Sequence, residues 1–165
     1  MAIAALPAPQ QAGFDNADVH LEPATQPVNS VTVHYWAPQA QPYRVGHVSM
    51  TLPDGTYISW FPQKQLPISD VSRGRTLTKD TTDEGGAPDD YVISGVDTKK
   101  FEEWWKKFEK DHKSWIFSGP NCTTVVEEAL TIGGAKDVPT GPEFVTPAKL
   151  LPALKKLSNP PTTQP

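Results

Sequence analysis

Two segments in the first half of the chain alternate between apolar and polar residues. Residues 30–36 read SVTVHYW and residues 44–52 read RVGHVSMTL. A period of two is typical of a β-strand with one buried face. The sequence Pro-Asp-Gly at 53–55 then favours a tight hairpin turn, so residues 56–61 are predicted to return as the partner strand.

This turn also predicts which residues face each other across the hairpin. With a three-residue loop after Leu52, Ser49 lies opposite Ser59 and His47 lies opposite Phe61. Ser59 is then a diagonal neighbour of His47 on the same face, with about 7 to 8 Å between the backbones. The hairpin is therefore expected to have one face with a histidine and hydroxyl groups. The opposite face is apolar and carries Val48, Met50, Ile58 and Trp60.

Three later segments have the longer period of amphipathic helices. The first is capped by Asp97 and runs to Lys113, with an apolar stripe of aromatic residues. The second begins at Pro120 or Asn121 and ends at a glycine pair, which is a common helix stop. The third covers residues 146–157 and begins with a proline in its first turn.

The remaining segments complete a prediction for the whole chain. Residues 62–89 are polar with several Asp and Thr, so we expect a loop or lid over a site, and residues 90–96 read as a short strand. The fold class is α+β, with an antiparallel sheet packed against helices, and residues 29–157 are expected to form one domain. The Ala-, Pro- and Gln-rich lead over 1–28 and the tail over 158–165 are expected to be disordered or linker.

Composition narrows the possible partners. The 165 residues carry a net charge of -4, so the basic field that binds nucleic acid is missing. No apolar run is long enough for a transmembrane segment. The start of the chain has neither the positive region nor the long apolar region of a cleavable signal peptide, which leaves a cytoplasmic protein or one exported by dedicated machinery. The oligomeric state stays open.

The single cysteine, Cys122, falls where the second helix is predicted to begin. Asn121 is a suitable N-cap, and the first turn of a helix favours an anion such as a thiolate. The helical period places the thiol toward the packed side of the helix, facing a sheet. These features allow two interpretations of Cys122: a reactive nucleophile, or a free cysteine packed as a small hydrophobic residue.

The histidine strand and the cysteine helix together resemble a known family. The segment GHVSMTLPDGTYISWF, followed much later by NCTTVVEEAL, is similar to the circularly permuted branch of the NlpC-type papain-like fold. This branch includes lecithin:retinol acyltransferase-like proteins and relatives of the PPPDE isopeptidases. In it, the histidine strand precedes the cysteine helix, and an Asp-Gly turn lies between the histidine strand and its partner. The resemblance covers about residues 43 to 155.

The resemblance implies a fold and a site. The fold would be papain-like, with Cys122 as nucleophile and His47 as its base. Ser59 occupies the position of the family's third polar residue, which is often a second histidine, and a serine there cannot offer a negative charge to the imidazolium. His34 on the neighbouring strand is an alternative third residue. Asn121 would position the helix start, where the backbone N–H of Cys122 would be an oxyanion donor, and no metal or other cofactor is implied.

These observations lead to three hypotheses for the function. The first is a cysteine-dependent hydrolase of peptide or amide bonds, which could be an effector or toxin delivered by dedicated machinery. The second is a phospholipase or acyltransferase that acts on lipid esters with the same site. The third is a papain-like binding module whose catalytic site is degenerate at Ser59.

Overall fold

The computed structural model describes residues 29–41, 43–139 and 146–158. In this part of the chain it has two antiparallel sheets and four helices, which confirms the α+β class. The predicted disordered lead over residues 1–28 lies outside the described residues. So does the predicted tail, except for Ser158, which is the last residue of a helix.

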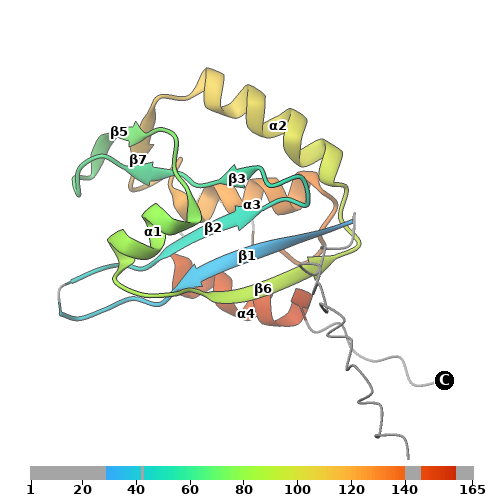
Figure 1. Ribbon diagram of the computed structural model, residues 1–165, viewed down its shortest axis with the longest axis horizontal. Coiled ribbons are helices and arrows are strands. Elements are labelled where there is room, and N and C mark those ends of the chain that lie inside the picture. The colour runs from blue at the N-terminus through green and yellow to red at the C-terminus, as the bar shows by residue number, and fades with distance from the viewer. Residues whose placement is uncertain (1–28, 42, 140–145, 159–165) are drawn as a thin grey trace, which may run out of the picture.

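The two sheets are built almost entirely from the first two thirds of the chain. The larger has the strand order β3-β2-β1-β6 and the smaller has the order β4-β5-β7 (Figure 1). The strands of the larger sheet are β1 Ser30–Trp36, β2 His47–Thr51, β3 Tyr57–Ile58 and β6 Asp89–Ser94. Those of the smaller sheet are β4 Phe61–Pro62, β5 Ile68–Ser72 and β7 Ser114–Ile116.

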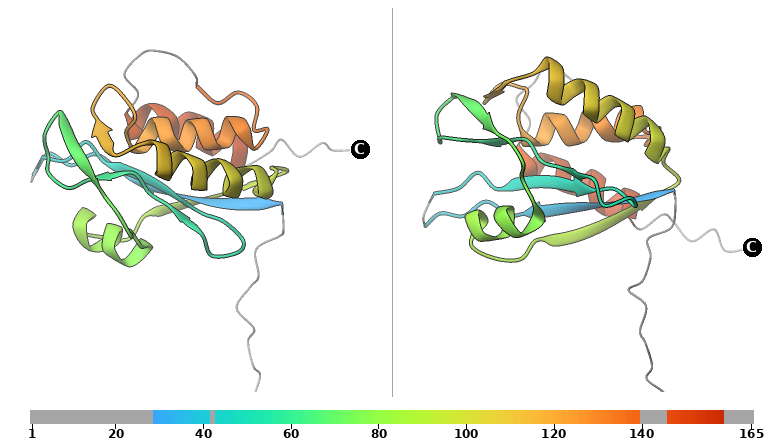
Figure 2. Two further views of the ribbon diagram at one scale, coloured as in Figure 1. Left: turned by 90° about the horizontal axis from the view of Figure 1, so that it is seen from above. Right: turned by 45° about the horizontal axis from the view of Figure 1, so that its top comes forward.

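Helices cover both faces of the larger sheet. Figures 1 and 2 show a short helix on one face and the longer helices on the other. The short helix is α1, Leu77–Glu84. The other three are α2 Thr98–Asp111, α3 Cys122–Ile132 and α4 Pro147–Ser158. All three of these were predicted from the sequence with ends within two residues of those observed, and Asp97 caps α2 as expected.

The predicted hairpin register is correct near the turn and wrong further from it. Met50 pairs with Ile58, as the three-residue loop requires. Ser59 and Trp60 then leave the sheet, and Phe61 begins β4, which pairs with β5 instead. The direct strand pairs of Ser49 with Ser59 and of His47 with Phe61 therefore do not form. The chain bends there because it passes from one sheet to the other.

The prediction of a loop over residues 62–89 is wrong, because this segment contains β5 and α1. Helix α1 escapes a search for apolar periodicity because its buried residues are Asp80 and Glu84, both charged. Its ends are set by local capping instead: the side chain of Thr76 accepts a hydrogen bond from the N–H of Lys79, and Gly85 closes the helix with a left-handed φ of 78°.

The larger sheet has one apolar face and one face with polar residues. Alternate residues of β1 and β2, such as Val33 and Met50, are fully buried on the face covered by α3 and α4. The residues between them, among them His34 and His47, lie on the opposite face with α1 and are buried as well. An apolar face therefore holds the fold together, while the polar face is free to carry chemistry.

Candidate active site

Cys122 is the first residue of α3. The side chain of Asn121 accepts hydrogen bonds at 3.0 Å from the backbone N–H groups of Thr123 and Thr124. In turn, the Thr124 hydroxyl oxygen accepts a hydrogen bond from the backbone N–H of Asn121. This capping box fixes the start of the helix at the position that the sequence predicts. The thiol is 6% exposed and lies where the helix dipole favours a negative charge.

His47 begins β2 and is held between two aromatic rings. The ring of Trp36 lies on one side at 5.3 Å and that of Phe61 meets it edge-on at 4.9 Å, measured between ring centroids. Its Nε2 lies 3.2 Å from the Ser59 hydroxyl, so the predicted contact of His47 with Ser59 is present although the strand pair is not. The imidazole is 2% exposed, and its orientation is fixed by these neighbours.

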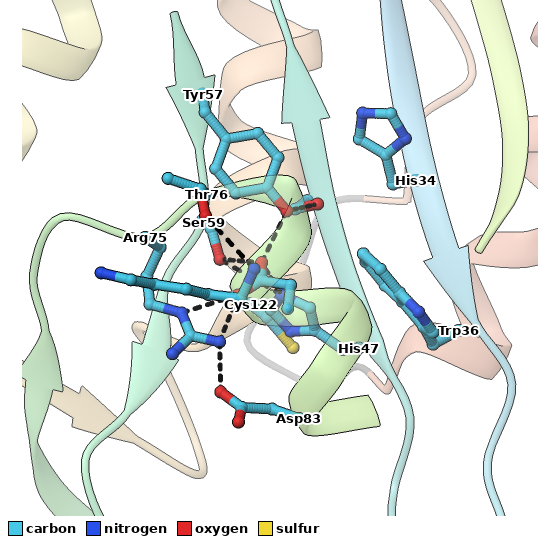
Figure 3. A network of polar contacts seen from close by, with 12 residues as sticks. His34, Trp36, His47, Tyr57, Ser59, Arg75, Thr76, Asp83 and Cys122 are labelled. Atoms are coloured by element: carbon cyan, nitrogen blue, oxygen red, sulfur yellow. Dashed lines mark hydrogen bonds and ion pairs between the residues drawn. The ribbon is translucent and has the colours of Figure 1, made fainter. Parts of the chain in front are cut away.

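A buried carboxylate that the sequence did not point to completes the arrangement. Nε2 of His47 lies 3.0 Å from Oδ2 of Asp80, which comes from α1 and is fully buried. The same oxygen accepts hydrogen bonds from the hydroxyls of Tyr57, at 2.6 Å, and Ser59, at 2.7 Å (Figure 3). Ser59 thus contacts the carboxylate and the imidazole together, and Asp80 gives the imidazole a charged partner.

Arg75 neutralises the other side of this carboxylate. Its Nε donates to Oδ1 of Asp80 at 2.6 Å, and its Nη2 pairs with Asp83 at 2.6 Å. The guanidinium carbon lies 4.1 Å from the ring centroid of Phe61, the ring that also contacts His47. A buried charge is costly unless it is paired and hydrogen-bonded, and Asp80 meets both conditions.

These contacts favour the charged forms of both partners. Burial by itself would raise the pKa of Asp80, but hydrogen bonds, led by the one from His47, lower it to about 2. Burial by itself would lower the pKa of His47, but its interactions with Asp80 and Cys122 raise it to about 9. The pKa of Tyr57 is raised by burial and by Asp80, which keeps its hydroxyl a hydrogen-bond donor.

The thiol and the imidazole meet in the lining of one cleft. Figure 3 shows the sulfur of Cys122 beside the His47 ring, and their interaction contributes to the raised pKa of His47. Because Nε2 is already engaged, Nδ1 is the ring nitrogen that can exchange a proton with the thiol. The cleft has a volume of about 350 Å³ and a mostly apolar wall, to which Phe61, Leu66, Trp115 and Phe117 contribute.

The other candidate residues have different roles in the structure. His34 contacts Asp90 at 2.6 Å and Thr51 at 2.7 Å, and Trp36, two residues along β1, lies against His47 instead. His34 is therefore not the third residue. The amide group of Asn121 is occupied by the cap and by the Phe117 carbonyl, so it positions Cys122 and is not free to bind an oxyanion.

The N–H of Cys122 keeps its predicted place at the start of α3. The side chain of Asn121 takes the next two N–H groups, and its carbonyl takes the N–H of Val125. Within the described residues, no acceptor occupies the Cys122 N–H. The geometry is therefore compatible with an oxyanion donor.

Only weak signals in the sequence could have indicated Asp80. Thr76 and Gly85 bracket a stretch of helix length, and Asp80 and Glu84 are four residues apart, on one face. Polar residues with this spacing ordinarily lie on a solvated face, so the pattern does not distinguish a buried carboxylate from an exposed one. Its burial depends on Arg75 and Tyr57, which tertiary structure brings to it.

Among the residues that the structure describes, no group of three or more His, Cys, Asp or Glu side chains is placed to hold a metal ion. In the same ranges, no helix combines the length and the apolar character needed to cross a membrane.

Fold and site together define an α+β protein in which a buried Cys-His-Asp cluster opens into an apolar cleft. Comparison with known proteins identifies no relative: no protein-family model, curated protein or solved structure matches the chain. The case for a function therefore depends on the geometry of the site.

Proposed function

We propose that the protein is a cysteine-dependent hydrolase of amide or peptide bonds with a permuted papain-like fold. Cys122 is the nucleophile, His47 is the general base and acid, and Asp80 holds the imidazole. The order of the elements supports this, because the histidine strand β2 precedes the cysteine helix α3, which packs against the sheet.

The observation that carries the proposal is the double engagement of one buried imidazole. His47 contacts a buried carboxylate through Nε2 and interacts with the only cysteine of the chain. A carboxylate fixes the tautomer of the ring and stabilises its protonated form, and a protonated ring stabilises a thiolate. Such an arrangement activates a nucleophile, and Cys122 and His47 both line the cleft.

The chemistry that follows from it has two stages. The thiol of Cys122 passes its proton to Nδ1 of His47, and the sulfur attacks the carbonyl carbon while the N–H of Cys122 faces the developing oxyanion. The C–N bond then breaks, the imidazolium gives its proton to the leaving amine, and an acyl thioester remains. Water gives a proton to His47 and attacks the thioester, the C–S bond breaks, the acid is released, and the imidazolium returns its proton to the thiolate of Cys122.

The second candidate, hydrolysis or transfer of lipid esters at the same site, has one observation in its favour. The mouth of the cleft carries apolar side chains that are well exposed: Tyr43 at 75%, Leu66 at 52% and Phe117 at 43%. Such side chains suit an acyl chain as well as an apolar amino-acid side chain. The third candidate, a degenerate binding module, was based on the absence of a charged partner for His47, and Asp80 is such a partner.

The test of the proposal is the pH dependence of alkylation by iodoacetamide. Because Cys122 is the only cysteine, the reaction reports one site, and Cys122→Ala gives the background. We expect the wild-type thiol to react well below pH 8.5, the ordinary pKa of a cysteine. In His47→Ala that reactivity should be lost, and the profile should return to that of an ordinary thiol.

A matched control uses the other strand histidine. His34→Ala removes an imidazole that contacts Asp90 and not the cleft, and it should leave the profile of Cys122 unchanged. A thiol that reacts slowly in the wild type, with a profile that His47→Ala does not alter, would overturn the proposal. A positive result would then justify a screen of peptide amides and lipid esters.

A further inference from the structure

The wall of the cleft contains charged groups that the proposed chemistry does not use. Among the described residues, four buried side-chain polar atoms have no hydrogen-bond partner. Three of them belong to residues that line this cleft: Nη1 of Arg44, Oε2 of Glu84 and Nε1 of Trp115. Buried polar groups are nearly always paired in native proteins, so such a concentration in one cleft needs an explanation.

Arg44 and Glu84 lie close together in this wall. A Cβ atom added to Gly85 would be 3.3 Å from Nη1 of Arg44, so the guanidinium lies against the residue that follows Glu84. The charge of Arg44 acts on Glu84, and so does that of His47, which places the carboxylate near the catalytic imidazole. The two free atoms nevertheless make no hydrogen bond to each other.

The backbone that carries these two side chains is held by contacts that leave the two atoms free. The backbone of Arg44 pairs with Gln39 in both directions at 2.9 Å, and the Gln39 side chain donates to the carbonyl of Glu84 at 3.1 Å. The indole of Trp36, which also contacts His47, donates to the carbonyl of Gly86 at 2.8 Å. The backbone at the end of α1 is therefore tied to Trp36, a neighbour of the His47 ring.

We propose that Arg44 and Glu84 are a substrate-recognition pair that holds the backbone amide of a peptide in the cleft. Arg44 donates to a carbonyl oxygen and Glu84 accepts from an N–H group, while an apolar side chain of the peptide lies against Leu66 and Phe117. This inference rests on the proposed hydrolase, and it selects peptides over the other substrates that the site could accept.

The chemistry of the pair favours this class of substrate. A lipid ester has no N–H group at its reacting end, so it would leave the buried carboxylate of Glu84 without a donor. A free ammonium group would satisfy Glu84 but would be repelled by Arg44 beside it. An amide carries one donor and one acceptor and satisfies both residues without a net charge.

The test uses peptide electrophiles that alkylate Cys122. The parent probe is the chloromethyl ketone of acetyl-Phe-Ala, and two analogues each replace one backbone N–H with an ester oxygen. Each inactivation rate is divided by the iodoacetamide rate of the same variant, which cancels changes in the thiol itself. For the wild type we expect one of the two analogues to react at least about tenfold more slowly than the parent, the effect of one hydrogen bond to a charged group.

Two variants probe the two halves of the pair. Glu84→Leu should react with the parent and with that analogue at rates within about twofold, because the acceptor for the N–H is gone. Arg44→Met should keep the discrimination but bind the parent about tenfold more weakly, with little change in the maximal rate of inactivation. Glu103→Leu, which removes an exposed carboxylate from α2, serves as the control and should behave as the wild type.

The outcomes separate this inference from the proposed function. A wild type that does not distinguish either analogue from the parent, or a Glu84→Leu variant that still does, overturns the recognition pair while the iodoacetamide profile can still support the hydrolase. If Glu84→Leu does not fold, the test depends on Arg44→Met. An Arg44→Met variant that binds the parent probe as tightly as the wild type overturns the recognition pair. The proposed hydrolase is contradicted by a different result: a pH profile of Cys122 alkylation that His47→Ala does not change.

Discussion

The carboxyl group of Asp80 is the shared hydrogen-bond partner of four polar side chains of the candidate site. It accepts hydrogen bonds from His47, Tyr57, Ser59 and Arg75. Each donor favours the ionised carboxylate, which in turn favours the protonated imidazole. The reactivity of Cys122 is therefore expected to depend on Asp80, a residue of α1 that does not itself line the cleft.

Replacement of this carboxylate tests that dependence. Asp80→Asn keeps the size of the side chain but removes its charge, so the pKa of His47 should fall and the thiolate should lose stabilisation. We expect the alkylation rate of Cys122 at pH 6.5 to fall at least about tenfold, the effect of a rise of about one unit in the pKa of the thiol. Asp70→Asn, on the exposed part of β5, is the control, and an unchanged pH profile in Asp80→Asn would contradict the assignment.

At the level of elements, the sequence predicts β1, β2 and the three helices with an apolar face. It misses α1, whose buried residues are charged, and the short strands β5 and β7 of the smaller sheet. The alternation in β1 and β2, the Asp-Gly turn and the cap at Asn121 are local signals, and the structure confirms them. The bend at Ser59 and the placement of α1 depend on contacts between distant segments, such as that of Phe61 in β4 with Ser72 in β5. Such contacts leave no periodic trace in a single sequence.

The same contrast explains which site residues were predicted. His47 and Cys122 stand out because a turn and a cap mark their positions, and the hairpin register brings Ser59 near the histidine. Asp80 depends on Arg75 for its burial, and a sequence motif does not show that this pair forms. The two reacting groups could thus be predicted, whereas the carboxylate that orients them could not.

The packing of α2 on α3 is set by one close approach. A Cβ atom added to Gly133, at the end of α3, would lie 2.3 Å from the ring of Phe101, which is fully buried in α2. The backbone of Gly133 is helical, so an alanine there would be unfavourable only through this clash.

Gly133→Ala should therefore destabilise the protein by about 1–3 kcal/mol, the usual cost of overpacking a core. The measurement is the free energy of unfolding in urea. Gly86→Ala is the matched control, because its Cβ atom would meet open space, and it should change that free energy by less than about 0.5 kcal/mol. Equal effects of the two substitutions would show that the contact with Phe101 is not limiting.

For the whole molecule, three buried groups set how stability varies with pH. Burial raises the pKa of Glu127 from 4.5 to about 7, so its contribution is lost as pH rises between these values. The raised pKa of His47 means that its contribution is complete below pH 6.5 and is lost as pH rises through about 9. Asp80 acts in the opposite sense, because its pKa is lowered from 3.8 to about 2 and its contribution is lost as pH falls through that range.

These signs predict a stability maximum near about pH 5 and a decline toward alkaline pH. The measurement is the free energy of unfolding in urea at pH 5, 7 and 9. Glu127→Gln should remove about 1–3 kcal/mol of the decline between pH 5 and 7, since the buried charge is no longer formed, and should leave the decline between pH 7 and 9 intact. A Glu127→Gln protein that loses stability between pH 5 and 7 as steeply as the wild type would contradict the role given to this carboxyl.

Helix α1 contacts the rest of the protein through buried charged residues, and this affects how the protein would lose activity. Most helices in proteins are held by the packing of an apolar face, but the two buried residues of α1, Asp80 and Glu84, are both charged. Local unfolding of this helix would leave the hydrophobic core intact and yet remove the partner of His47 and the proposed recognition carboxylate in one step. Inactivation would then precede denaturation, and a sample with an unchanged melting curve could already have lost its function.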